Sequence, residues 1–345
     1  MRRVFGTYEG TPIEEISLTG PGISAKIITW GASVRDLVIA TPRGPQRVVI
    51  GFDQLDHYLA YAAHAGAIAG RYANRIDGAS FSIDGKQYTL PKNEFERQTL
   101  HGGGRGQAFG ERPWQIAAFD ATSVTLTLHS PDGDAGFPGA LDVSCTYRLT
   151  EPATLRIELT ARTQATTALN LASHSYFHLD LPSGFANRAV PPSIDHEFEV
   201  ASDFYAPLDR YNIPTGEILN VADTVYDFRT RRPIRHESGT KYDMGFVVRD
   251  TPYAGHLPYA ATLHGPATGM RMDVFTTEPH LQFYDAAHFH APVAGLDGAQ
   301  YGAHCGICLE PQRYPDAPNR RHFGASLLRP DETYAQVTEC RFQAG

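Results

Sequence analysis

The sequence predicts an all-β protein, a large antiparallel β-sandwich with few short helices. Short runs of alternating apolar and polar residues recur along the chain between turn-forming residues, as in 123–128, 141–147 and 155–159. Strands do not alternate with helical segments, as they would around a parallel sheet. Many short strands separated by turns are typical of two packed antiparallel sheets, each strand with one solvent-exposed face.

A hairpin is predicted within residues 81–90. The dipeptide Asp84-Gly85 stands between two alternating runs, and these two residue types readily adopt the positive φ angles of a two-residue turn.

Helical patterning is scarce, and one short helix is expected. It begins at Asp53, the expected N-cap, and continues through Leu55, Tyr58 and Leu59 into an alanine-rich stretch.

The organisation of the chain indicates a single domain over residues 1–345. Hydrophobic residues make up 42% and charged residues 20%, a profile that excludes disordered and fibrous classes. Serine- and glycine-rich linkers, charge blocks and fixed-period repeats are absent from the sequence.

The charge distribution argues against nucleic acid and membrane partners. The formal net charge is -8, and the only basic run, 229–232, is too short for an electrostatic footprint. Residues 1–20 turn polar and acidic and lack the apolar core of a signal peptide, and no stretch approaches a transmembrane span.

The four cysteines are expected to be free thiols of a cytoplasmic protein: Cys145, Cys305, Cys308 and Cys340. Cys305 and Cys308 have redox spacing, but the βαβ context of a thioredoxin-like site is missing around them.

Cofactor and metal motifs are also missing, and we expect neither a cofactor nor a metal. The sequence has no P-loop, dinucleotide fingerprint, HExxH motif or EF-hand loop. His288 and His290 have no obvious partners to complete a metal site, so a surface or structural role is favoured for both.

Five segments are harder to explain by folding alone: 70–76, 100–104, 172–179, 241–246 and 306–319. In the last of them, strand alternation places Glu310 on the face of Cys308, opposite Ile307 and Leu309. If that face is buried, desolvation raises the pKa of the carboxyl toward a range useful to a base near neutral pH. A glutamate on the exposed face of a strand is the commoner alternative.

The other polar residues of these segments are individually ambiguous. His174 can titrate near neutral pH, but taken alone a core histidine bonded to a neighbouring hydroxyl is the commoner explanation. The same holds for His101 before its three glycines, and Asp243 and Arg75 are compatible with surface ion pairs. Residue patterns alone therefore leave the substrate open.

Together, and in this order, the five segments resemble the aldose 1-epimerase (galactose mutarotase) family. Residues 30–37, the 136–139 loop and residues 327–342 are also similar to it, so the resemblance covers nearly the whole chain. It implies a β-sandwich of the galactose mutarotase type that binds a free aldose such as galactose or glucose, as a monomer or homodimer.

The resemblance also implies residue roles. Glu310 matches the base that takes the proton from the C1 hydroxyl, and His174 matches the acid that protonates the ring oxygen. Six further residues match positions that line the sugar site: Asn74, Arg75, His101, Tyr176, Asp243 and Gln282. Ser173, His178 and Met244 depart from the family pattern, which leaves substrate preference more open than activity.

Three alternatives remain from the sequence. A carbohydrate-binding protein without catalysis would keep the fold and lose the chemistry. A glycoside hydrolase would use two carboxylates, Glu310 and Asp243. An epimerase of sugar phosphates would need an arginine cluster at the mouth of the site, for which Arg71 and Arg75 are the candidates.

Overall fold

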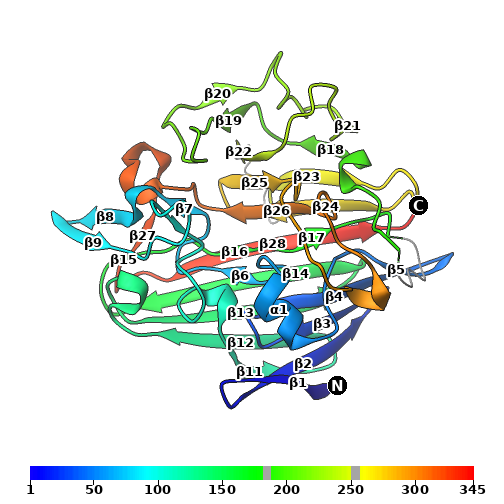
Figure 1. The fold of residues 1–345 in the computed structure, drawn as a ribbon, viewed down its shortest axis with the longest axis horizontal. Coiled ribbons are helices and arrows are strands. Elements are labelled where there is room, and N and C mark those ends of the chain that lie inside the picture. Colours follow the sequence, from blue (N-terminus) through cyan, green and yellow to red (C-terminus); the bar gives the residue numbers. More distant parts are fainter. Residues whose placement is uncertain (182–187, 250–256) are drawn as a thin grey trace.

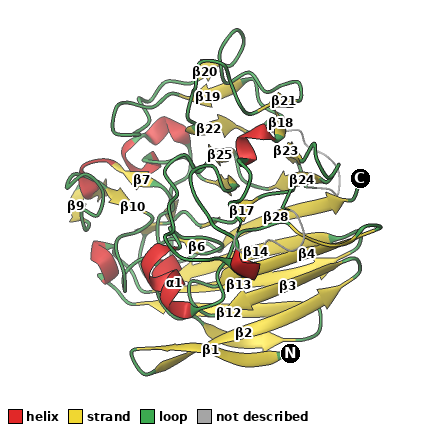
Figure 2. Ribbon diagram, turned by 45° about the vertical axis from the view of Figure 1, so that its right-hand side comes forward, coloured by secondary structure: helices red, strands yellow, loops and turns green. Residues whose placement is uncertain are grey.

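The computed structural model describes residues 1–181, 188–249 and 257–345. Antiparallel strands dominate it, and Figure 2 shows the helices lying among the loops. Three sheets contain most of the strands, which confirms the predicted all-β class.

The largest sheet has nine strands, in the order β11 (Gln115–Phe119), β12 (Ser123–Ser130), β13 (Leu141–Thr150), β14 (Thr154–Thr163), β28 (Tyr334–Gln343), β24 (Arg271–Thr276), β23 (Tyr259–His264), β18 (Glu197–Val200) and β21 (Arg232–Pro233). The five-stranded sheet runs in chain order through β1 (Arg2–Tyr8), β2 (Thr11–Gly20), β3 (Ile23–Ile28), β4 (Ser33–Thr41) and β5 (Gly44–Arg47). The six-stranded sheet has the order β17 (Tyr176–Phe177), β26 (Ile307–Gln312), β25 (His280–Tyr284), β22 (Asp243–Val247), β19 (Phe204–Ala206) and β20 (Leu219–Asn220).

Four two-stranded pairs complete the strands: β7 (Arg75–Ile76) with β10 (Thr99–Leu100), β6 (Ile68–Ala69) with β16 (Ala172–Ser173), β8 (Ser80–Ile83) with β9 (Lys86–Thr89), and β15 (Thr167–Ala168) with β27 (Leu327–Leu328). The described residues contain one α-helix, α1 (Leu55–Tyr61), and short 3-10 turns at Asp77–Ala79, Phe109–Glu111, Asp134–Gly136, Ser193–Asp195, Leu296–Gly298, Ala317–Asn319 and Arg321–Phe323. None of these helices has the length and apolar character needed to cross a membrane.

Most strands and the hairpin follow the expectations. The runs 123–128, 141–147 and 155–159 lie within β12, β13 and β14. Asp84 and Gly85 form the turn between β8 and β9 with φ angles of 50° and 80°.

The helix is present, but its expected N-cap is wrong. Gln54 occupies that position and makes no side-chain capping bond. Asp53 instead accepts a hydrogen bond from Arg35 Nη1 at 3.1 Å, because the buried Arg35 guanidinium offers a stronger, charged donor.

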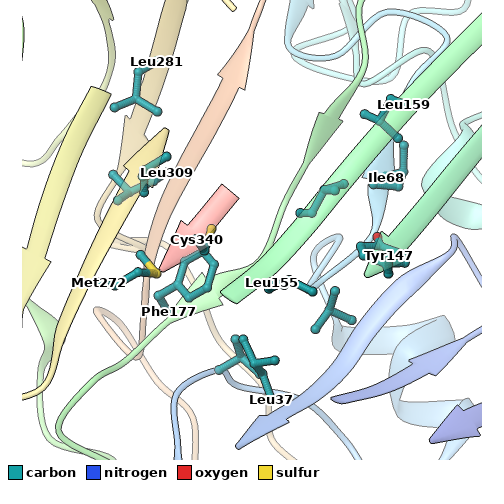
Figure 3. Packing of buried hydrophobic residues seen from close by; sticks show 14 of the residues in the cluster. Leu37, Ile68, Tyr147, Leu155, Leu159, Phe177, Met272, Leu281, Leu309 and Cys340 are labelled. Atoms are coloured by element: carbon teal, nitrogen blue, oxygen red, sulfur yellow. The ribbon is translucent and has the colours of Figure 1, made fainter. Parts of the chain in front are cut away.

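The main core lies where the three sheets meet. Leu37 of β4, Tyr147 and Leu155 of the nine-stranded sheet, and Leu309 of β26 belong to one buried cluster (Figure 3). The hydroxyl of Tyr147 crosses the layers and donates to the carbonyl of Ala32 at 2.7 Å.

The six-stranded sheet presents two different faces. Met244, Leu281 and Leu309 point into the core, whereas their neighbours Asp243, Gln282 and Glu310 lie on the opposite face. In Figure 1, β25 and β26 lie at the height of β23 and β24 of the nine-stranded sheet, and β12 and β13 of that sheet lie below them. Three adjacent strands, β22, β25 and β26, thus bring polar residues from distant parts of the chain onto one surface.

Phe283 of β25 links two sheets and provides a test of the core. Its ring stacks on that of Phe198 in β18, with centroids 4.6 Å apart and planes 4° apart. Phe283→Ala should lower the free energy of unfolding by about 3–5 kcal/mol, because it removes a buried ring and leaves a cavity. Urea unfolding would measure the loss.

Phe204→Ala is the matched control for this experiment, since Phe204 is 43% exposed in the same sheet. It should change the free energy of unfolding by less than about 1 kcal/mol. Equal effects of the two substitutions would contradict the packing described for Phe283.

Candidate active site

A cavity of about 300 Å³ opens on the polar face of the six-stranded sheet. All eight site residues expected from the sequence line it: Asn74, Arg75, His101, His174, Tyr176, Asp243, Gln282 and Glu310. Three of them come from β22, β25 and β26, and the others come from the loops and short strands that cover this face.

Glu310 lies on the floor of the cavity and is 2% exposed. Its Oε2 atom is buried and has no hydrogen-bond partner among the described residues. Burial raises the pKa of the carboxyl well above its usual value, the negative charge of Asp243 raises it further, and Arg75 opposes the shift. Alternation alone leaves open whether the face of Glu310 and Cys308 is buried, and an exposed glutamate is the commoner alternative; the structure shows that this face is buried.

His174 faces Glu310 from the segment between β16 and β17. Its backbone is held on both sides: its N–H donates to Ala67 at 2.8 Å, and its carbonyl accepts from Gly66 at 3.0 Å. Its Nε2 atom lies 3.6 Å from Glu310 Oε1, and its Nδ1 atom lies 3.6 Å from the sulfur of Cys308. Burial, with a smaller contribution from His64, lowers the pKa of His174 to about 3.

A carboxyl and an imidazole at this separation have the chemistry of an acid–base pair. A carboxylate removes a proton and an imidazolium delivers one, and the two lie close enough to act on neighbouring atoms of one substrate. Burial disfavours charge on both, so the state with an ionised Glu310 and a protonated His174 is raised in energy.

His101 is oriented by its backbone and by Asn74. It has a φ of 52°, and its Nδ1 atom accepts a hydrogen bond from the backbone N–H of Asn74 at 3.1 Å. In the neutral imidazole the proton then sits on Nε2. Burial, with the neighbouring His64 and His174, lowers the pKa of His101 well below its usual value, so it remains a neutral donor.

Gly102 allows this placement of His101. It has a φ of 85°, and a Cβ atom there would collide with the backbone of Gly70 and Arg71. The glycine-rich segment 100–104 therefore brings a histidine against the β6–β7 backbone.

A network of charged and amide groups forms the other end of the cavity. Arg75 donates to both oxygens of Glu94, at 2.8 and 3.0 Å, and to Asp243 Oδ2 at 3.2 Å. Gln282 Nε2 donates to Asp243 Oδ1 at 2.7 Å. Burial disfavours the charge on Arg75, but Asp243 and Glu94 outweigh it and raise the pKa of the guanidinium.

Tyr176 packs beside the acid–base pair. Its ring lies 5.1 Å from that of His174, and its hydroxyl donates to the carbonyl of Ala63 at 3.0 Å. It thus holds the wall of the cavity to the segment after α1.

Sequence reasoning missed several lining residues: His64, Glu94, Asn212, Tyr284 and His288. All five lie outside the five segments that are hard to explain by folding alone. Strand alternation could have found Tyr284, because it shares a face of β25 with Gln282. His288 and His290 are both exposed, as favoured, and His288 lies at the edge of the cavity.

Arg71 does not contribute to an arginine cluster. It is 2% exposed and donates to the carbonyls of Pro138 and Gly139, away from the cavity. The arginine cluster that the sugar-phosphate alternative would need is not formed by Arg71 and Arg75, because buried carbonyls surround the first guanidinium and carboxylates engage the second.

The three departures from the family pattern lie outside the cavity lining. Met244 points into the core, His178 bonds through Nε2 to the carbonyl of Pro191 at 2.8 Å, and Ser173 lines a small void beneath the sheet. Met244 also lines a neighbouring cavity of about 280 Å³ that shares Asp243 and Asn212 with the active-site cavity.

A larger hollow of about 690 Å³ lies along the nine-stranded sheet. His129 and Asp142 form an ion pair in this hollow, and their side chains are 59% and 73% exposed. Ion pairs this exposed to solvent interact weakly. The smaller cavity, with its buried ionisable groups, is the stronger candidate for an active site.

The four cysteines are free, as expected, and all four are buried. Burial raises the pKa of the Cys308 thiol well above its usual value, so the thiol stays protonated.

Comparisons with known proteins show which family the chain resembles. The pattern of the family described as aldose 1-epimerase matches residues 14–341. Galactose mutarotase of Rattus norvegicus is 36% identical over 99% of this chain and 98% of its own. Aldose 1-epimerase of Haemophilus influenzae is 32% identical over 98% of each.

Solved structures resemble the fold as a whole. An aldose epimerase homologue from C. elegans superposes with a TM-score of 0.86 at 28% identity, covering 96% of this chain and 99% of that chain. Galactose 1-epimerase from Lactobacillus acidophilus superposes with a TM-score of 0.84 at 21% identity, covering 100% and 98%, and supports the fold alone.

The buried carboxyl of Glu310 predicts a pH-dependent cost to stability. Its folded-state pKa lies above the ordinary 4.5, so the folded chain holds the proton more tightly and stability falls as pH rises through this window. Glu310→Gln, which cannot ionise, should match wild type near pH 4.5 and exceed it by about 1 kcal/mol or more at pH 8. Urea unfolding at both pH values would measure this.

Glu9→Gln, at an exposed position, is the control and should show no such trend. A Glu310→Gln variant less stable than wild type at pH 8 would mean that Glu310 is stabilised by a partner.

Proposed function

The chain belongs to the aldose 1-epimerase family and interconverts the α and β anomers of free aldoses such as galactose and glucose, and we propose that Glu310 and His174 perform the proton transfers. The separation of 3.6 Å between His174 Nε2 and Glu310 Oε1 carries the proposal. The C1 hydroxyl and the ring oxygen are bonded to the same carbon, so an acid and a base this close can reach both.

Ring opening requires that one proton is removed from the sugar and another is delivered to it. Glu310 removes the proton from the C1 hydroxyl, and the O–H electron pair becomes the second bond of the C1 carbonyl. The bond between C1 and the ring oxygen breaks, and His174 donates its Nε2 proton to that oxygen. After rotation about the C1–C2 bond, His174 takes the proton back, the oxygen attacks the other face of C1, and Glu310 returns its proton.

Neighbouring groups support these transfers. His101 is held as the tautomer with a proton on Nε2, which can donate to the ring oxygen as negative charge develops there. Arg75, Asp243 and Gln282 offer donors and acceptors for the sugar hydroxyls on the other side of Glu310. Asn74 and Tyr176 complete the proposed sugar-binding set.

The alternatives receive less support. Asp243 accepts hydrogen bonds on both oxygens, from Gln282 and Arg75, so it is poorly placed to act as a second hydrolytic carboxylate. A purely binding protein gains nothing from a buried, unpartnered carboxyl, which costs stability.

We further propose that the protein is one domain, acts in the cytoplasm and works as a monomer or homodimer. The four free, buried thiols support a reducing compartment.

Substitution of either proposed catalytic group should abolish most activity without loss of folding. Glu310→Gln and His174→Asn should each lower kcat by about 10²- to 10⁴-fold, because each removes one proton transfer. Polarimetry of freshly dissolved α-D-galactose and α-D-glucose would measure the rates.

His129→Asn is the matched control for the histidine, since His129 is 59% exposed and remote from the cavity. Retention of more than about a tenth of the wild-type kcat in Glu310→Gln would overturn its role as base.

Activity should follow a bell-shaped pH profile. The pair is productive while it holds one proton: a second proton removes the acceptor, and loss of the last removes the donor. Because burial lowers the pKa of His174 to about 3, uptake of the second proton and the acidic limb should lie well below pH 6.5. The alkaline limb should follow the raised pKa of Glu310.

The pH dependence of kcat/KM reports the pKa values of the free enzyme, so its measurement tests this assignment. An acidic limb centred near pH 6.5 would show that His174 keeps its ordinary pKa, and the buried-pair description would then fail.

A further inference from the structure

A second cavity of about 350 Å³ adjoins the active-site cavity. Ala63, His64 and His288 line both cavities, so the two meet at these residues. The second cavity lies between α1, the segment 105–111 and the turn at 288–290, where α1 lies in front of the sheets in Figure 1.

His64 forms the partition between the two cavities. Its ring centroid lies 4.7 Å from that of His101 and 6.0 Å from that of His174, and the lining of the second cavity includes neither Asp243 nor Gln282. Its Nδ1 atom is buried without a hydrogen-bond partner among the described residues. Burial lowers the pKa of His64, so the ring is a neutral, polar wall.

The proposed acid–base roles orient the sugar relative to this wall. C1 bears its hydroxyl toward Glu310 and the ring oxygen toward His174. C2 then lies on the side of Gln282 and Asp243, because these residues flank Glu310 on the neighbouring strands. C5 follows the ring oxygen, so its exocyclic C6 lies on the side of His101 and His64.

We propose that the second cavity is a subsite for a neutral glycosyl group attached to O6 of the aldose, an inference that rests on the proposed function. Its volume falls within the range of small-ligand pockets. The lining combines the 37% exposed ring of Tyr61 with polar groups of Glu111, Arg105 and His290. One arginine is offset by one glutamate, so the lining suits a neutral sugar better than a phosphate.

The test compares mutarotation of glucose, of the 6-O-glycosyl glucoses melibiose and isomaltose, and of the 4-O-glycosyl glucoses maltose and lactose. The key variant is Ala60→Trp, because Ala60 is exposed on α1 and lines only the second cavity. Ala60→Ser is the matched control.

Wild type should act on melibiose and isomaltose with a kcat/KM within about tenfold of that for glucose. Ala60→Trp should lower this value at least about tenfold for the 6-O-linked sugars, because the indole fills the subsite, and less than about twofold for glucose. Ala60→Ser should leave all substrates unchanged.

Three results would overturn the subsite: activity on glucose without activity on melibiose, an Ala60→Trp variant that keeps wild-type activity on melibiose, or an equal loss on maltose and melibiose. Faster turnover of glucose 6-phosphate than of melibiose would overturn its neutral character. Failure with both glucose and galactose would refute the proposed function, whereas a failure confined to the 6-O-linked sugars would refute only the subsite, so the two failures are distinguishable.

Discussion

The burial of the Glu310 carboxyl beside the His174 imidazole is the constraint on which the site depends. In water both groups would hold their ordinary charges at neutral pH, and neither would be a good partner for a weakly acidic sugar hydroxyl. Exclusion of water raises the pKa of Glu310, which makes it a stronger base, and lowers the pKa of His174, which makes it a stronger acid. Both shifts lower the stability of the fold. The strands and loops around the pair hold two groups in a state that they would not adopt alone.

The six-stranded sheet meets this constraint because one of its faces packs in the apolar core and the other lines the cavity. Leu309 and Leu281 anchor β26 and β25 in the apolar core, so Glu310 and Gln282 are fixed through the same backbone. The histidines come from loops, but each is tied by backbone bonds, as His174 is to Ala67 and His101 is to Asn74. Rigidity in the core is thereby transmitted to groups that are not part of it.

The sequence was sufficient for features that depend on local pattern. Alternation predicted the strands and the shared face of Glu310 and Cys308, but not its burial, and the turn chemistry of Asp84 and Gly85 predicted the hairpin. Features made by distant contacts could not be read in this way: Arg35 draws Asp53 from the helix cap, and His64 joins the site through the approach of two loops. The eight proposed site residues came from family resemblance, because no local signal distinguishes a cavity histidine from a structural one.

The alternation along β26 also limits how this protein can diverge. Inserting or deleting one residue in the strand would exchange Leu309 and Glu310 between the faces, placing a carboxyl in the hydrocarbon interior and a leucine among the polar groups. No single compensating substitution could repair both errors. Changes in chain length should therefore accumulate in connecting segments, while the spacing of residues within β25 and β26 stays invariant among functional descendants of this chain.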